Sequence, residues 1–313
     1  MANLYFNAAV DNDWDTLLNW WSDAAFTIPS IALPATGDTV YIAADMYTGP
    51  SVPVTLNHIY VADASTGGGA FLVRLNVNIT SDVTFFDLSG TLGSGQFVGN
   101  VIFNDSSYND IYFAITGAVT FNDSSYNADA AVITGATTFN DSSYNVGIIN
   151  GATTFNYLSS NSGIVTGNCI FNGSSFNTAL ASGTATFNDS SYNNAGGLVD
   201  YETIFNDSSY NAGDLYDVST FNNLSYNSGT IYSGGVTFNN SSYNTGGVGT
   251  ATFNDSSYNT GGVEDGIFNG LYVSTRVQGS YDNSITLNMT CAASGGSDQT
   301  IARLLNLPWF INL

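Results

Sequence analysis

Carboxylates recur at one position of a repeated motif, and their regular spacing is the feature of this sequence that could support chemistry. The heptapeptide FNDSSYN begins at Phe103 and returns, intact or with substitutions, as far as Phe268. If successive copies stack as parallel strands, equivalent carboxylates lie about 5 Å apart. Oxygen ligands at such a spacing suit Ca²⁺. The repeated carboxylates are Asp105, Asp123, Asp141, Asp189, Asp207 and Asp255.

Calcium is the one metal ion or cofactor that the sequence suggests, and the alternative is a column of solvated carboxylates. The column is interrupted at Tyr157, Gly173, Asn223 and Asn240. The chain also lacks the GGxGxDxUx nonapeptide of calcium-binding β-helices. Both observations favour solvated positions in which Asn side chains separate the charges.

Carboxylates about 5 Å apart are also the machinery of retaining glycosidases. A catalytic pair should be a local departure from the repeat, whereas the repeated Asp residues are the same from copy to copy. Asp200 and Glu202, in VDYETIF, form such a departure, but a weak one. His58 is the only histidine, and nothing near it suggests partners for a Ser/His/Asp triad. We therefore predict no catalytic residues and a protein that is not an enzyme.

Two further motifs allow more than one interpretation. Each intact FNDSS contains an N-x-S glycosylation sequon, as at Asn104, but stacked Asn side chains can instead hydrogen-bond along a ladder. Thr residues before several Phe residues, such as Thr137 and Thr153, would suit an ice-binding array. The Thr-x-Thr repeat of such arrays is not maintained in this chain. We therefore favour a structural ladder over a glycosylated or ice-binding surface.

The period of the repeat predicts the elements that position these residues. Copies of the motif follow one another at intervals of 15 to 18 residues. A period this short and persistent indicates a solenoid in which each repeat is one coil. Asn, Gly, Ser, Thr and Asp are abundant in the repeats and are poor helix formers, which excludes helical coils. We predict an all-β fold, a single elongated β-solenoid that is three-sided and has 15–18 residues per coil.

A finer period of five residues predicts which side chains face the core. An aromatic residue stands five residues after nearly every Phe of the motif. A small residue stands two positions before the Phe, and another stands two positions before the second aromatic residue. Because alternate residues of a strand share a face, we expect stacked Phe and Tyr columns in the core. The Phe column comprises Phe103, Phe121, Phe139, Phe155, Phe171, Phe187, Phe205, Phe221, Phe238, Phe253 and Phe268. The Tyr column comprises Tyr108, Tyr126, Tyr144, Tyr192, Tyr210, Tyr226, Tyr243 and Tyr258.

This rhythm, with a small residue two positions before a central Phe or Tyr, resembles the pentapeptide-repeat class of β-solenoids. The chain departs from that class in two ways. Its coils are not built from four five-residue segments, and Asn follows the central residue instead of preceding it. The resemblance implies stacked β-coils but neither four sides nor a handedness. Repeats rich in Asn, Ser and Tyr are also similar to those of phage and environmental surface proteins.

The segments that flank the repeats are interpreted as caps. Residues 1–48 contain DWDTLLNWW and resemble the opening segment of many bacterial surface β-solenoids, where they would cap or attach the solenoid. We interpret residues 49–100 as irregular first β-coils, 101–270 as the repeat solenoid and 271–313 as a C-terminal cap or assembly segment. The end of a solenoid exposes core and unpaired strand edges, which large aromatic residues can cover. The residues expected to cap the ends or mediate assembly are Trp14, Trp20, Trp21, Trp309 and Phe310.

The charge balance excludes several classes of partner. Three Lys and Arg stand against 25 Asp and Glu, which gives a net charge of −22. Such a chain should not bind nucleic acid or an anionic membrane, and no apolar run is long enough for membrane insertion. The first residues lack the basic and apolar regions of a secretory signal peptide. Cys169 and Cys291 do not define a disulfide framework.

We expect a structural rod on a virion surface, such as a phage fibre, spike or capsid-decorating protein, acting as a rigid spacer or adhesin. Its partners would be other virion or surface proteins, host glycans or further copies of the chain, and its location the virion surface or the extracellular space. One alternative is a bacterial surface protein or self-assembling filament. A second alternative is a tailspike that degrades polysaccharide.

Overall fold

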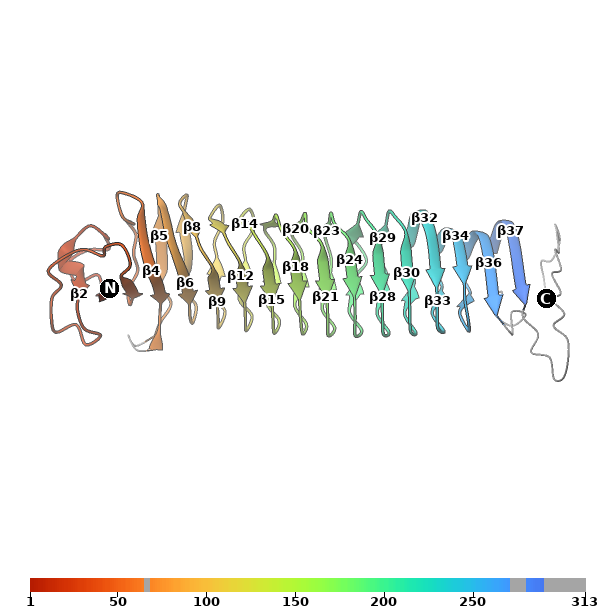
Figure 1. Ribbon diagram of the computed structural model, residues 1–313, viewed down its shortest axis with the longest axis horizontal. Helices are drawn as coiled ribbons and strands as arrows, with labels where there is room; N and C mark the ends of the chain where they lie inside the picture. The colour runs from red at the N-terminus through yellow and green to blue at the C-terminus, as the bar shows by residue number, and fades with distance from the viewer. Residues whose placement is uncertain (65–67, 271–279, 290–313) are drawn as a thin grey trace. The chain divides into compact units, whose positions relative to one another are not determined.

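A computed structural model describes residues 1–64, 68–270 and 280–289 of the chain. These residues form strands and turns, and the helical segment among them is the 3-10 turn η1 (Leu17–Asn19). The chain divides into two compact units, Met1–Asn168 and Cys169–Leu313. Within each unit, successive coils add parallel strands side by side (Figure 1), which confirms the predicted all-β solenoid.

Three kinds of strand recur along the first unit. The Phe strands, which contain the Phe position or its equivalent, are β1 (Asn3–Phe6), β3 (Thr39–Ile42), β4 (Val54–Val61), β6 (Asn78–Phe85), β9 (Val101–Phe103), β12 (Val119–Phe121), β15 (Thr137–Phe139) and β18 (Thr153–Phe155). The Tyr strands, which lie at the Tyr position or its equivalent, are β5 (Leu72–Leu75), β7 (Gly90–Gly93), β10 (Tyr108–Asn109), β13 (Tyr126–Asn127), β16 (Tyr144–Asn145) and β19 (Ser160–Asn161). The third strands are β8 (Gln96–Val98), β11 (Ala114–Thr116), β14 (Val132–Thr134), β17 (Ile148–Ile149) and β20 (Ile164–Val165).

The second unit uses the same three kinds of strand. Its Phe strands are β21 (Cys169–Phe171), β24 (Ala185–Phe187), β27 (Thr203–Phe205), β30 (Ser219–Phe221), β32 (Thr230–Phe238), β34 (Gly247–Phe253), β36 (Gly262–Gly270) and β37 (Ser280–Met289). Its Tyr strands are β22 (Phe176–Asn177), β25 (Tyr192–Asn193), β28 (Tyr210–Asn211), β31 (Tyr226–Asn227), β33 (Tyr243–Asn244) and β35 (Tyr258–Asn259). Its separate third strands are β23 (Leu180–Ala181), β26 (Leu198–Val199) and β29 (Asp214–Leu215).

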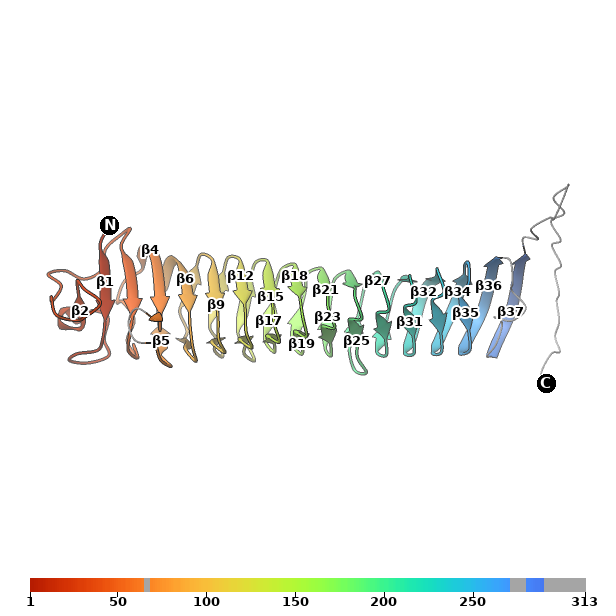
Figure 2. The same cartoon turned by 90° about the horizontal axis from the view of Figure 1, so that it is seen from below.

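Equivalent strands pair in parallel and in register, but the three strands of a coil fall into two sheets. Phe121 lies beside Phe139, and Tyr126 lies beside Tyr144. β6 pairs with both β8 and β9, so third strands and Phe strands share one sheet, while the Tyr strands form the other. Figure 2 shows β1, β4, β6, β9 and β12 side by side in the first unit. We expected a three-sided coil; each regular coil has three strands, and pairing places these strands in two sheets.

The Phe column occupies the core of both units. Phe121 and Phe139 are fully buried, and their ring centroids lie 4.7 Å apart with planes 3° from parallel. Phe187 and Phe205 repeat this arrangement in the second unit, at 4.7 Å and 6°. In the first unit the column also continues before the first repeat, because Phe85 stacks on Phe103 at 4.8 Å. The remaining predicted members, Phe103, Phe155, Phe171, Phe221, Phe238, Phe253 and Phe268, are fully buried too.

The structure corrects the expectation of a Tyr column in the core. The side chains that point inward on the Tyr strands are Ser and Asn, for example Ser125 and Asn127, which are fully buried. The Tyr rings stand on the outer surface, half-buried, and still stack, with Tyr126 and Tyr144 at 4.9 Å. The members of this outer ladder are Tyr108, Tyr126, Tyr144, Tyr192, Tyr210, Tyr226, Tyr243 and Tyr258.

The physical reason for this inversion lies in the turn that joins a Phe strand to a Tyr strand. Asp105 and Ser106 both adopt positive φ, 56° and 80°, and the Ser107 N–H donates to the Asn104 carbonyl at 2.9 Å. Two successive left-handed residues are the pattern of a type I′ turn, which Asp and Asn tolerate. The turn preserves the alternation that began at the Phe, so Ser107 and Asn109 point inward and Tyr108 points outward.

The aromatic cluster near the N-terminus is packed inside the first unit. Trp14 and Trp20 are 1% and 0% exposed, with ring centroids 4.7 Å apart, and Phe6 lies 5.2 Å from Trp20. β2 (Trp20–Trp21) pairs antiparallel with the end of β1 and thereby covers part of its outer edge. Trp14 and Trp20 therefore pack inside this unit, and of the three predicted Trp residues only Trp21 is partly exposed.

The described part of the segment after the repeats is one further strand. β37 pairs in parallel with β36, and Leu287 lies in register with Phe268. Residues 280–289, which we assigned to a C-terminal cap, therefore extend the Phe-strand sheet of the second unit. Trp309 and Phe310 lie outside the described residues.

Truncation of one buried ring tests the assignment of the core. Phe139 stacks on Phe121 at 4.7 Å and on Phe155 at 4.9 Å. Phe139→Ala should lower the free energy of unfolding by about 3–5 kcal/mol, because it loses apolar burial and leaves a cavity. Chemical denaturation followed by circular dichroism measures the change. Tyr144→Ala, on the outer ladder of the same coil, is the control and should lose less than half as much; equal losses would contradict the assignment.

Candidate functional site

The repeated carboxylates sit at exposed turns, where backbone geometry accounts for them. Asp123 and Asp141 have φ of 53° and 51°, and both are exposed. Non-aspartate residues occupy the same left-handed position at Tyr157 and Asn223, with φ of 48° and 54°. Turn chemistry therefore explains this column without a ligand, since Asp and Asn adopt positive φ more easily than most residues.

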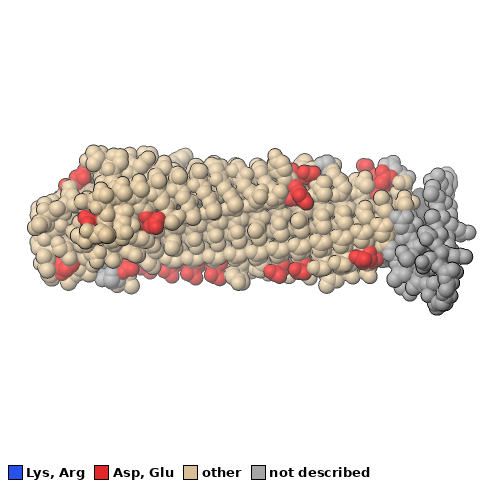
Figure 3. Space-filling model, in the orientation of Figure 1, with Lys and Arg blue, Asp and Glu red and all other residues tan. Residues whose placement is uncertain are grey.

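The structure does not gather these carboxylates into a metal centre. Over residues 1–64, 68–270 and 280–289, no group of three or more Asp, Glu, His or Cys side chains is arranged to hold a metal ion. In the coil after Asp207, the column has Asn223 in place of Asp. The Asn223 amide donates to the Asp207 carboxylate at 3.1 Å, so Asp207 has an amide and not a second carboxylate beside it on that side. Figure 3 shows acidic side chains recurring along one edge of the face that it draws. The arrangement is that of solvated charges at turns.

The inward Asn residues form a buried hydrogen-bonded ladder in each unit. Asn109 donates to Asn127, Asn127 to Asn145 and Asn145 to Asn161, each at 2.9 Å between Nδ2 and Oδ1. All of these side chains are fully buried. In the second unit the ladder runs through Asn177, Asn193, Asn211, Asn227, Asn244 and Asn259.

At Asn211, local backbone groups complete the hydrogen bonding of the buried amide. Asn211 Nδ2 also donates to the Gly213 carbonyl at 3.0 Å, and Asn211 Oδ1 accepts from the Gly213 N–H at 3.2 Å. With the two ladder bonds, both protons and both acceptor positions of the amide are used. A buried amide without such partners would be costly, and full satisfaction explains why Asn, and not Tyr, faces the core.

A second Asn ladder follows the Phe positions and accounts for the glycosylation sequons. Asn122 Nδ2 donates to Asn104 Oδ1, and Asn140 Nδ2 to Asn122 Oδ1, both at 2.9 Å. These side chains are partly buried. The ladder gives the repeated Asn residues of the sequons a structural role that does not depend on a glycan.

Burial in the outer Tyr ladder shifts the ionisation of Tyr126 and Tyr210. Burial, with the neighbouring Tyr144 and Asp110, raises the pKa of Tyr126 above its ordinary value of 10.0. Burial, with Tyr192 and Tyr226, does the same for the pKa of Tyr210 in the second unit. A phenolate at Tyr126 or Tyr210 would be partly desolvated and close to other ionisable groups, which disfavours the charged form.

The first coils contain a departure from the repeat that the sequence interpretation missed. Tyr5, Tyr41 and Tyr60 stack at 4.7 and 5.1 Å on the outer face of β1, β3 and β4, and His58 stacks on Tyr60 at 4.1 Å. Burial lowers the pKa of His58, which the nearby Asp82 opposes. The signal was present in the strands TVYI and HIYV, where an outward Tyr precedes an inward aliphatic residue, but the register between them comes only from the fold.

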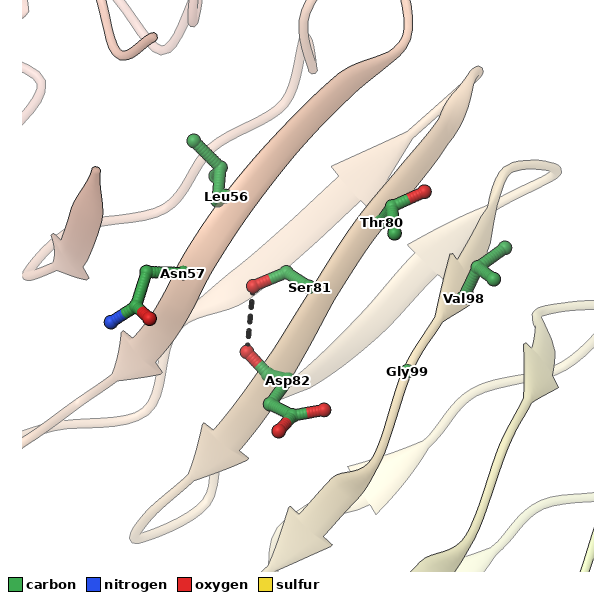
Figure 4. Close-up of a pocket in the computed structure, with 7 residues that line it drawn as sticks. All are labelled: Leu56, Asn57, Thr80, Ser81, Asp82, Val98 and Gly99. Carbon is green, nitrogen blue, oxygen red and sulfur yellow. Dashed lines mark hydrogen bonds between the residues drawn. The ribbon is translucent and has the colours of Figure 1, made fainter. Parts of the chain in front are cut away.

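A shallow hollow of about 280 Å³ lies beside this stack, between β4, β6 and the end of β8 (Figure 4). Its lining consists of Leu56, Asn57, Thr80, Ser81, Asp82, Val98 and Gly99. Asp82 Oδ1 accepts from the Asn100 N–H at 2.8 Å, and Ser81 Oγ donates to the Asp82 carbonyl at 2.7 Å. His58 Nε2 lies 3.0 Å from Thr84 Oγ1. Ser81 and His58 are thus engaged elsewhere and do not form a nucleophile–base pair.

The other candidate residues also have structural placements. Asp200 accepts from Ser182 Oγ at 3.3 Å, Glu202 is exposed, and neither carboxylate has the buried environment that tunes a general acid. Cys169 fills the inward small-residue position of its strand, and burial raises the pKa of its thiol to about 12. Such a thiol is a poor nucleophile at neutral pH.

Comparison of the chain with protein-family models, with curated proteins and with solved structures found no match. In the described part of the chain, no helix has the length and apolar character needed to cross a membrane.

A single substitution in the inner ladder tests its contribution. Asn145→Asp keeps the size and the acceptors of the side chain but removes the protons given to Asn161 Oδ1 and to the Gly147 carbonyl. We expect a loss of about 3 kcal/mol or more, measured by chemical denaturation at neutral pH, because the new carboxylate is buried and unpaired. The loss should shrink as the pH falls and this carboxyl group becomes neutral. Asn150→Asp, at an exposed position, is the control, and a similar loss there would count against the ladder.

The Tyr ladder predicts a limit to stability at alkaline pH. The raised pKa values of Tyr126, Tyr210 and Tyr243 mean that the folded chain holds these protons more tightly than the unfolded chain. The contribution of these tyrosines to the free energy of unfolding is complete below the ordinary pKa of 10.0. It is lost as the pH rises through their pKa values in the folded chain. Tyrosinate absorbance should therefore rise together with unfolding. Ionisation of all tyrosines at their ordinary pKa, with the fold intact, would contradict the ladder.

Proposed function

We propose that the chain is a structural, non-enzymatic component of a virion surface, a fibre, spike or decorating protein that serves as a rigid spacer or adhesin. The observation that supports this best is the continuity of the amide ladders within each unit. Each regular coil is bonded to both neighbours through backbone, Asn and aromatic contacts. No coil among the described repeats gives up these contacts to build a catalytic centre.

The same contacts favour stiffness. Opening one coil would break the Asn ladder on both of its sides, for example Asn127–Asn145 and Asn145–Asn161. It would also unstack Phe139 from both of its neighbours. Loss of one coil is therefore coupled to its neighbours, as in other repeat proteins whose stability is dominated by nearest-neighbour interfaces.

The N-terminal edge favours a spacer over a filament that grows end to end. An open strand edge is a template for another strand. Here β2 occupies part of the outer edge of β1 and places Trp20 beside Phe6. This blocks strand addition at the position where the next coil of a second molecule would have to pair.

Proteolysis and activity assays test this proposal. The chain contains 20 Phe, 19 Tyr and four Trp but few Arg and no Lys, so chymotrypsin, and not trypsin, is the informative protease. The native full-length protein should be cleaved roughly 100-fold more slowly than the heat-denatured protein, because cleavage requires local opening. Comparable rates would contradict a rigid spacer.

Two further outcomes would overturn other parts of the proposal. Release of reducing sugar from host polysaccharides would identify a tailspike enzyme. Antibodies raised against the chain should label intact virus particles of the source, and labelling confined to disrupted cells would contradict a virion location.

A further inference from the structure

Over five successive coils of the first unit, one face carries no charge, although the chain is strongly acidic. We call it the neutral face and define it as the outward side chains of residues 96–102, 114–120, 132–138, 148–154 and 164–168. These five segments contain no Asp, Glu, Lys or Arg. The acidic residues of the same coils, such as Asp105, Asp110 and Asp129, lie on the turns and on the segments around the Tyr strands.

In-register pairing arranges the neutral face into straight columns. Thr120, Thr138 and Thr154 lie beside one another on the Phe strands. Val132, Ile148 and Ile164 do so on the third strands, where Ile164 remains 41% exposed. The face therefore combines methyl groups and hydroxyls on a sheet surface that repeats with each coil, at about 4.8 Å.

The fold does not impose this neutrality. In the second unit, Asp214 takes the outward position of its third strand, in register with Leu198. Asp200 and Glu202 follow the third strand of another coil, and Asp265 lies in register with Thr250 in a later one. Acidic residues are thus tolerated at these outward positions in some coils, whereas the five successive segments of the neutral face contain none.

We propose that the neutral face is a self-association surface on which a second copy of this chain packs face to face. With a net charge of −22, two copies repel each other on faces that carry carboxylates, and among residues 1–64, 68–270 and 280–289 Arg74 is the sole Lys or Arg. The neutral face removes that repulsion where contact is made. A second copy also presents columns with the same axial spacing, so that rows can interdigitate along the whole face in a two-fold arrangement.

The size of the face sets the strength of this contact. Five coils at about 4.8 Å and seven residues at about 3.3 Å cover roughly 550 Å² on each copy, or roughly 1,100 Å² in a dimer. This is at the low end of specific interfaces, so we expect reversible association that depends on concentration. The contact is independent of the spacer role, and its failure would leave that role untouched.

Sedimentation velocity of the full-length protein over a concentration series tests the proposal. The native chain should show a reversible monomer–dimer equilibrium. The double variant Thr120→Glu and Thr138→Glu places charges at the centre of the face and should raise the dissociation constant at least tenfold, roughly 1.4 kcal/mol. The matched control, Thr220→Glu and Thr237→Glu, alters the same column in the second unit and should leave the equilibrium unchanged.

A lysine variant separates face contact from net charge. Thr138→Lys lowers the net negative charge, and it should still weaken the dimer because it places a long charged side chain on the face. Stronger association of the Thr138→Lys variant would overturn the proposal. So would a native chain that stays monomeric at every concentration, or a Thr220/Thr237 control variant that weakens the dimer as much as the Thr120/Thr138 variant. Thermal unfolding confirms that each variant folds. One further result would also overturn the proposal. If the native protein is a monomer that binds insoluble neutral polysaccharide, and the Thr120/Thr138 double variant does not bind it, the face is a glycan-binding surface.

Discussion

In-register stacking is the constraint on which the rest of this structure depends. Each side chain in a regular coil lies beside the same position of the next coil, so a residue can recur only if it is compatible with its own copy. Asn satisfies this condition because its amide both donates and accepts, as the Asn127–Asn145 bond shows. Aromatic rings satisfy it by stacking, as in Phe121 and Phe139. Carboxylates satisfy it less well, since like charges repel, and the repeated Asp residues lie at exposed turns. The scarcity of charge, 9% of residues, is consistent with this rule.

The sequence predicted the parts of the fold that follow from period and hydrophobicity. The coil period and the Phe column emerge from spacing alone, and both are present in the structure. The Tyr column was wrong because we ranked a large aromatic ring above an amide for burial. That ranking ignores the φ angles of Asp105 and Ser106, which set the side-chain direction, and the hydrogen bonds of Asn109. We interpreted residues 49–100 as irregular first coils but residues 1–48 as a cap, because Ile42 takes the Phe position in β3 and no motif marks that strand.

The candidate site was less accessible to sequence reasoning than the fold. The carboxylate column stood out as a motif, yet turn geometry accounts for it. The departure from the repeat, with Tyr41, Tyr60, His58 and Asp82, comes from three coils of different length, and pairing alone brings these residues together. A search for periodic sequence patterns identifies residues that recur at a fixed spacing and misses residues that occur only once. In a repeat protein, function is expected in the exceptions, and these can be placed only after the register is known.

The two Asn ladders add a last consequence of stacking. Amides bonded in a row align their dipoles, as peptide groups do in a helix, and aligned dipoles accumulate charge at the ends. The inner ladder donates toward the following coil, from Asn109 to Asn127, whereas the outer ladder donates toward the preceding coil, from Asn122 to Asn104. The two rows therefore oppose each other within each unit. At the start of the first unit's repeats, Thr91 donates to Asn109, and the Phe85 carbonyl accepts from Asn104. Ordinary polar groups thus suffice to end both rows, because opposed ladders leave little net dipole for the first coils to compensate.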